Sequence, residues 1–154
     1  MIKFHLFIEN TRLLSDKLGI VPLLYGSLGL EYLTDNPLDA DDIDILVPHV
    51  FIGERWQEFK ALLESQGYLL ADEHEHTFVR DGVAYSYAEI EELEEFAGIH
   101  KQDIGVKSAD GVTFMLLSLE QYLAVYKKSS TDGYRVNVRQ KKDADKIRFI
   151  ESKL

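Results

Sequence analysis

Two short segments decide the fold: Leu23–Leu24–Tyr25–Gly26–Ser27 and, after a polar connection, Asp42–Ile43–Asp44–Ile45–Leu46–Val47. The first predicts a buried strand that breaks into a Gly-Ser turn. The second predicts a strand that begins with two carboxylates. Because side chains alternate between the two faces of a sheet, Asp42 and Asp44 are expected on one face and the isoleucines in the core.

The two aspartates and the turn point to the same chemistry. Carboxylates two positions apart on a strand lie roughly 7 Å from each other and can share a hard cation such as Mg²⁺. Without a cation they repel each other, which is costly where they are partly buried. A Gly-Ser turn that enters a helix offers backbone N–H groups to phosphate oxygens. The sequence therefore predicts metal-dependent phosphate chemistry.

The flanking sequence predicts a mixed α/β (α+β) sheet flanked by helices, with helices at the C-terminus. Apolar spacing predicts helices, and short apolar runs predict strands, while an Asp-Gly pair at 81–82 predicts a hairpin. Ser27 and Ser118 are expected to cap the helices that follow them. By residue number, helices are expected at 7–18, from 27, at 51–66, from 119 and from 141, and strands at 20–25, 42–47, 68–70, 77–80, 83–90 and 112–116. The chain is expected to form one domain over 1–154, with a core at about 20–116 and a helical segment at about 117–154.

Composition limits the partners. The 154 residues include 27 acidic and 17 basic side chains, which gives a net charge of −10 and argues against a nucleic-acid partner. Apolar runs are too short to cross a bilayer, so no membrane partner is expected. There is no cysteine, which excludes disulfides and thiolate chemistry. These features favour a cytoplasmic location.

The two segments resemble the signature of the nucleotidyltransferase superfamily related to DNA polymerase beta. That signature is an apolar residue, Gly and Gly or Ser, then acid–apolar–acid–apolar on the next strand; here these are Tyr25-Gly26-Ser27 and Asp42-Ile43-Asp44-Ile45. The order of elements over Leu23–Ile90 is also similar to the small nucleotidyltransferase core. Antibiotic-modifying nucleotidyltransferases look like the nearest broad analogues.

The resemblance implies a reaction and residue roles. Asp42 and Asp44 would bind Mg²⁺, with up to two ions, and Gly26 and Ser27 would hold the terminal phosphates of a nucleoside triphosphate. A nucleoside monophosphate would pass to a hydroxyl of an unidentified acceptor. Lys142 would neutralise further phosphate charge, although a surface lysine in a basic run is the simpler explanation. The acceptor would bind against the C-terminal helices or across a homodimer interface.

A third carboxylate completes the metal site in this superfamily and acts as base towards the acceptor hydroxyl. On the predicted strand 83–90, Glu89 is the candidate, with Glu91 or Glu92 as alternatives if the strand ends early. No Asp stands on that strand, and two other functions remain open. One is a nucleotide-binding or regulatory protein on the same fold without turnover, and the other is a Mg²⁺-dependent phosphohydrolase.

Overall fold

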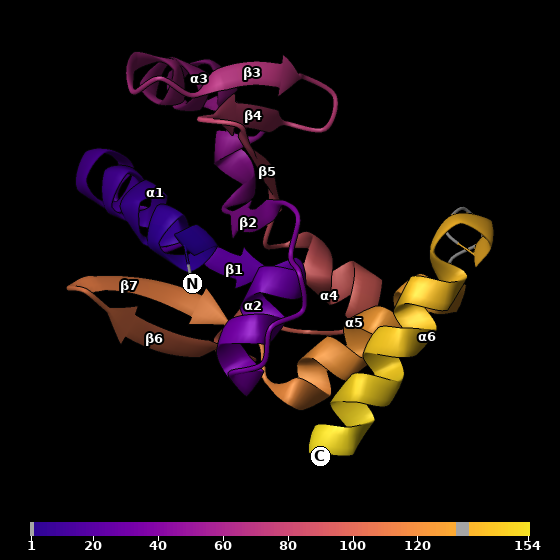
Figure 1. Ribbon diagram of the computed structural model, residues 1–154. Coiled ribbons are helices and arrows are strands. Elements are labelled where there is room, and N and C mark those ends of the chain that lie inside the picture. Colours follow the sequence, from indigo (N-terminus) through magenta and orange to yellow (C-terminus); the bar gives the residue numbers. More distant parts are fainter. Residues whose placement is uncertain (1, 132–135) are drawn as a thin grey trace.

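A mixed seven-stranded sheet, in the order β3-β4-β5-β2-β1-β7-β6, forms the centre of the molecule (Figure 1). The computed structural model describes residues 2–131 and 136–154, with the side chains of 2–131 and 143–154. The strands are β1 (Leu23–Tyr25), β2 (Ile43–Val47), β3 (Leu69–Asp72), β4 (Thr77–Arg80), β5 (Val83–Glu89), β6 (Gly105–Ala109) and β7 (Val112–Leu116).

The helices cover the sheet and extend to the C-terminus, which confirms the predicted fold class. They are α1 (Ile2–Leu18), α2 (Gly26–Thr34), α3 (Trp56–Ser65), α4 (Glu92–Ala97), α5 (Leu119–Thr131) and α6 (Val136–Lys153), with short 3-10 turns η1 (His49–Phe51) and η2 (Lys101–Asp103). In the described part of the chain, no helix is long and apolar enough to cross a membrane.

The alternation predicted for β2 is present. Ile43 and Ile45 are fully buried, whereas Asp44 is half-buried and Asp42, just before the strand, is exposed. Strand β2 pairs in parallel with β5 and antiparallel with β1. Strand β2 therefore lies inside the sheet, and its side chains point into the two layers on either side of it.

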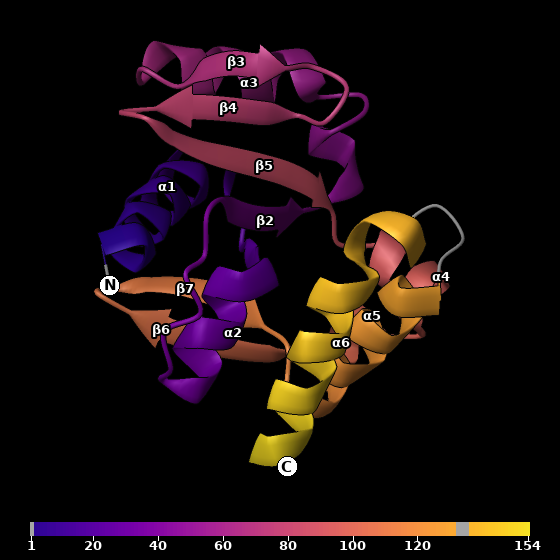
Figure 2. The same cartoon turned by 45° about the vertical axis from the view of Figure 1, so that its right-hand side comes forward.

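Two apolar cores fill these layers. One contains Phe7, Phe59 and the β2 isoleucines, and so joins α1 and α3 to one face of the sheet. The other contains Tyr122 and Ile150, from α5 and α6. Figures 1 and 2 both show α4, α5 and α6 grouped together and away from α1 and α3. The C-terminal helices thus stand beside the face that carries Asp44.

Several local predictions hold. Asp81 and Gly82 adopt φ of 52° and 77° between β4 and β5, as a tight hairpin with two left-handed residues requires. Ser118 caps α5, since its Oγ accepts a hydrogen bond from the Gln121 N–H at 3.1 Å and the Gln121 side chain accepts one from the Ser118 N–H.

Other local predictions are corrected. Ser27 does not cap α2: the helix begins at Gly26, Tyr25 is its N-cap, and no side chain caps it. Strand β1 begins at Leu23 rather than residue 20, because Pro22 cannot extend the ladder. Helices α1 and α6 begin earlier than predicted, at residues 2 and 136. Helix α4 and strand β6 were not predicted, because α4 is short and acidic and β6 is an exposed edge strand without an apolar face.

Gly29 of α2 packs closely against α5. A Cβ there would lie 2.1 Å from the Tyr122 hydroxyl and 2.7 Å from the Leu24 carbonyl oxygen. We expect Gly29→Ala to lower the free energy of unfolding by about 2 kcal/mol, the usual cost of overpacking, as measured by urea denaturation. Adding Tyr122→Phe should recover part of that loss, and a strictly additive double mutant would contradict the contact.

Candidate functional site

A row of polar side chains crosses four neighbouring strands on one face of the sheet. Asp44 on β2 is paired with Tyr25 on β1 and with Ser86 on β5, and Ser86 is paired in turn with Thr77 on β4. Cross-strand partners place their side chains on the same face. The hydroxyls of Ser86 and Thr77 are 2.9 Å apart. Asp44 is therefore the acidic member of a polar row.

Gly26 fits closely against Asp44. Its φ is +64°, and a Cβ there would lie 2.4 Å from Asp44 Oδ2 and 3.3 Å from Asp44 Cβ. Both the backbone conformation and the space therefore require glycine. The turn before α2 and the aspartate of β2 form one packed unit, which brings the two sequence segments together as predicted.

The Tyr122 hydroxyl ties α5 to this turn. It is 3.2 Å from the Gly26 carbonyl oxygen and 3.4 Å from that of Leu24, and Tyr122 is fully buried. Burial, followed by the charge of neighbouring groups, raises the pKa of Tyr122 well above its ordinary value, so the hydroxyl stays a hydrogen-bond donor. The C-terminal helices thereby support the Gly-Ser turn from behind.

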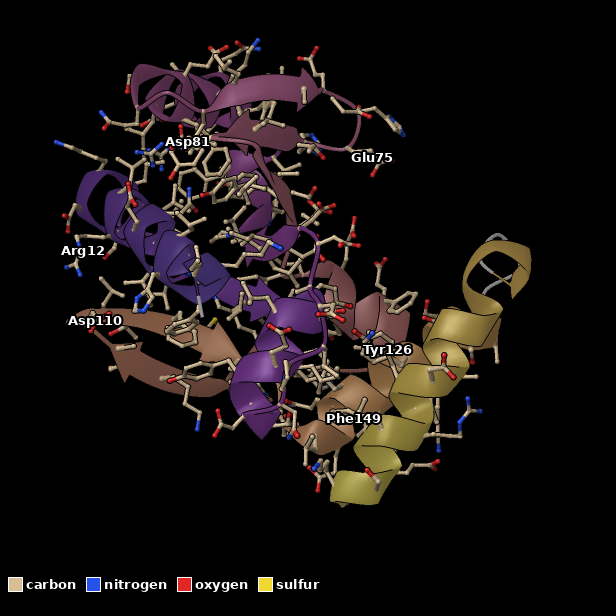
Figure 3. All side chains as sticks on the ribbon, in the orientation of Figure 1. Arg12, Glu75, Asp81, Asp110, Tyr126 and Phe149 are labelled. Atoms are coloured by element: carbon tan, nitrogen blue, oxygen red, sulfur yellow. The ribbon has the colours of Figure 1, made fainter. Side chains whose placement is uncertain are left out.

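Two cavities meet at Asp44. The first, of about 390 Å³, is lined by Gly26, Ser86 and Glu89, among others. The second, of about 330 Å³, is lined by Ser27 and Asp42. Three side chains line both cavities: Asp44, Tyr126 and Asp143. In Figure 3 the labelled Tyr126, on α5, lies beside α6 in the right-hand half of the view, and Glu75 lies in the connection between β3 and β4.

The second cavity gathers most of the predicted phosphate and metal residues. Ser27, Asp42 and Asp44 line it together with Lys146 of α6. Lys146 was not singled out by sequence, although it stands one helical turn after Lys142 in the same basic run. The side chain of Lys142 lies outside the described residues.

Two carboxylates in the second cavity suit a hard cation. Asp42 and Asp44 supply the carboxylate oxygens that a hard cation prefers, on the wall of one cavity. In the described part of the chain, no three Asp, Glu or His side chains are grouped closely enough to hold a metal by themselves. The pair therefore fits a Mg²⁺ ion whose remaining ligands are phosphate oxygens and water.

The predicted third carboxylate, Glu89, is not next to Asp44 in the strand register. Glu89 is paired with Val47, three positions after Asp44, so the register puts it on the opposite face of the sheet. It is also the last residue of β5, and it lines the first cavity at the strand end. Ser86, not an acid, stands next to Asp44 in the ladder. The role predicted for Glu89 stays a prediction.

The two alternatives to Glu89 have different surroundings. Glu91 accepts hydrogen bonds from the backbone N–H and the ring of His49, each 3.0 Å long. The hydrogen bond from the ring raises the pKa of His49. Glu92 lines the first cavity and is hydrogen-bonded to Glu89. Glu92 is exposed, but desolvation, then that hydrogen bond and the charge of Glu89, raise its pKa. Glu89 and Glu92 thus form a carboxyl pair at the cavity, and Glu91 is engaged elsewhere.

Asp143 connects the two C-terminal helices at the junction of the cavities. It is 1% exposed, and its Oδ2 accepts a hydrogen bond of 2.8 Å from the Ser129 hydroxyl of α5. A carboxylate this deeply buried costs free energy unless its surroundings compensate. Its position fixes α6, and with it Lys146, against the site.

One relative shows which family the chain belongs to. No family model matches the chain. The chain is 38% identical over 144 residues to the uncharacterized protein YnaI of Bacillus subtilis (strain 168), covering 94% of this chain and 92% of YnaI.

Two solved structures share the fold. The crystal structure of ANT(2")-Ia in complex with adenylyl-2"-tobramycin has a TM-score of 0.64 at 16% identity, over 96% of this chain and 87% of that one. The solution structure of the antibiotic-resistance factor ANT(2'')-Ia has a TM-score of 0.57 at 16% identity, over 94% and 87%. The chain belongs to the same family as YnaI, and it has a nucleotidyltransferase-like fold close to that of an antibiotic-type nucleotidyltransferase.

Proposed function

We propose that this protein is a nucleotidyltransferase that moves a nucleoside monophosphate from a triphosphate to a hydroxyl of a small acceptor. The observation that carries the proposal is the wall shared by Ser27, Asp42 and Asp44 in one cavity, next to the Gly26 turn. The acceptor oxygen forms a bond to the α-phosphorus, the bond to the bridging oxygen breaks, and pyrophosphate leaves.

The residues of the second cavity would bind the triphosphate. Asp42 and Asp44 would hold Mg²⁺, which when bound neutralises phosphate charge and orients the reacting groups. The first-turn amides of α2, which carry no side-chain cap, would contact phosphate oxygens. Lys146 would add the positive charge that the resemblance assigned to Lys142.

The acceptor proton would pass to the carboxyl pair in the first cavity. Glu89 and Glu92 line this cavity together with Asp44, so a hydroxyl bound there would have a carboxylate base in the same cavity. The raised pKa of Glu92 makes its carboxylate a stronger base than an ordinary glutamate.

The first cavity also suggests the class of acceptor. Its wall carries five carboxylates and several aromatic rings and, among the described residues that line it, no Lys or Arg. Carboxylates and aromatic faces both favour a cationic ligand. We therefore propose a hydroxyl compound that also bears amino groups. ANT(2")-Ia, which shares the fold, was solved in complex with adenylyl-2"-tobramycin.

The test is pyrophosphate release from each of the four nucleoside triphosphates with Mg²⁺ and a panel of amino-bearing and neutral hydroxyl compounds. Transfer predicts pyrophosphate and a nucleotidylated acceptor in equal amounts. Triphosphate binding without release would favour the second candidate, a nucleotide-binding protein, which the serine beside Asp44 supports. Acceptor-independent hydrolysis would favour the phosphohydrolase. The cytoplasmic location and the homodimer stay predictions.

At pH 7, Glu92→Gln should make the fold more stable and the enzyme less active. Folding raises the pKa of Glu92, so the folded protein favours the protonated form of this side chain. The contribution of Glu92 to the free energy of unfolding is therefore fully present below its unfolded pKa and is lost as the pH rises through its folded pKa. At pH 7 the variant should therefore unfold at a higher temperature than wild type, with the difference vanishing at pH 4.

The same variant should release pyrophosphate more slowly at pH 7, since it removes the carboxylate of the pair whose pKa is raised. Glu64→Gln, an exposed position on α3, serves as the control and should change neither quantity. Equal activity of Glu92→Gln and wild type across pH 5–8 would show that Glu92 takes no part in the reaction.

A further inference from the structure

Glu31 sits on α2, five residues after Gly26, and its carboxylate contacts the connection that leads to Asp42. Its Oε1 accepts a hydrogen bond from the Leu38 N–H at 2.6 Å and lies 3.4 Å from the Ala40 nitrogen, also as an acceptor. Glu31 is half-buried. One side chain thus binds two backbone amides within four residues of the first aspartate of the pair.

The connection from residue 35 to 41 needs such an anchor. Asp35 and Asp39 adopt φ of 55° and 52°, which L-residues adopt at a cost. Asp39 and Asp41 also line the second cavity with Asp42 and Asp44, so like charges act to push the connection away from the site. Neither the local backbone nor the local charge favours the conformation that the connection adopts.

A second charged anchor acts on the same segment from outside α2. The Lys3 ammonium of α1 donates a hydrogen bond to the Ala40 carbonyl oxygen, and Ala40 is buried. Lys3 therefore fixes the carbonyl of Ala40, and Glu31 fixes its amide. Because α2 also carries Ser27 in its first turn, the Glu31 contact sets the distance between the two sides of the second cavity.

We infer that Glu31 is a positioning residue: it holds the 35–41 connection on α2 so that Asp42 faces Ser27 and Asp44 across the metal and phosphate site. The inference rests on the proposed function. It requires only an acceptor atom at the end of the side chain, because both partners are N–H donors. Glutamine keeps that oxygen at the same reach, and alanine removes it.

The experiment measures Mn²⁺ affinity by electron paramagnetic resonance, with Mn²⁺ as the probe for Mg²⁺. Glu31→Ala should weaken binding by roughly tenfold or more, the usual loss when a group that orients a metal ligand is removed. Glu31→Gln should stay within about twofold of wild type by the same reasoning, since the oriented acceptor is retained. Glu64→Ala is the control. Hydrogen exchange should show faster exchange of the Leu38 and Ala40 amides in Glu31→Ala alone.

The outcomes separate this inference from the proposed function. If wild type binds no Mn²⁺, the metal site of the proposed function is wrong, and the inference falls with it. If wild type binds Mn²⁺ and Glu31→Ala binds equally well, the inference alone is overturned, whatever the change in melting temperature. Equal losses in Glu31→Ala and Glu31→Gln would also overturn it, because they would show that the charge acts and not the contact.

Discussion

Asp44→Asn should lower pyrophosphate release by about 1000-fold, close to 4 kcal/mol in activation free energy, the scale of metal-ion catalysis. Asp44 lines both cavities, and it stands in the ladder between Tyr25 and Ser86. Asparagine keeps the shape and removes the charge that a cation needs. The rate is measured with saturating Mg²⁺ and triphosphate.

The control for this variant is Asp16→Asn, which makes the same change of net charge at an exposed position on α1. Its rate should equal that of wild type. Thermal unfolding of both variants checks that the fold is intact. If Asp44→Asn kept more than a tenth of the wild-type rate while folded, Asp44 would not be a metal ligand, and the site would have to lie elsewhere.

Gly26→Ala should reduce activity by about 100-fold through a displacement of atoms rather than through a loss of charge. The new Cβ would meet Asp44 Oδ2 at 2.4 Å, and the aspartate can escape only by moving its carboxylate. A shift of about 1 Å in a catalytic group costs a factor of this size. The positive φ adds about 1 kcal/mol of instability, the cost of a left-handed conformation for alanine.

Gly19→Ala provides a matched control for this prediction. Gly19 has a φ of +65°, almost the same as Gly26, and a Cβ there would meet nothing within 4 Å. Both variants should therefore lose similar stability in urea denaturation, while Gly26→Ala alone loses activity. Similar rates for the two variants would show that the close contact with Asp44 has no part in the reaction.

The sequence predicted the features of the site that depend on neighbouring residues. Alternation along β2 places Asp44 opposite the buried isoleucines, and this follows from strand geometry alone. The Asp81–Gly82 hairpin and the Ser118 cap were predicted for the same reason, since each depends on a few adjacent residues. The assignment of Ser27 as a cap failed because the helix already begins at Gly26, so Ser27 lies inside its first turn.

Features that join distant segments did not follow from the sequence. Ser86 lies beside Asp44 because β2 and β5 pair in parallel, a register set by the packing of both cores. Lys146 lines the cavity because α6 packs on α5 through Asp143 and Ser129. Glu31 and Lys3 converge on Ala40 from two helices. No periodicity in the sequence encodes these contacts.

By itself, the sequence determined a glycine turn and an alternating pair of aspartates, because both are consequences of local backbone geometry. The tertiary structure decided what surrounds them: a serine at the neighbouring ladder position, a carboxyl pair at the end of β5, a lysine from α6 and a glutamate anchor on α2. These partners come from residues far apart in the chain, and only the packing of the sheet and its helices brings them to one place.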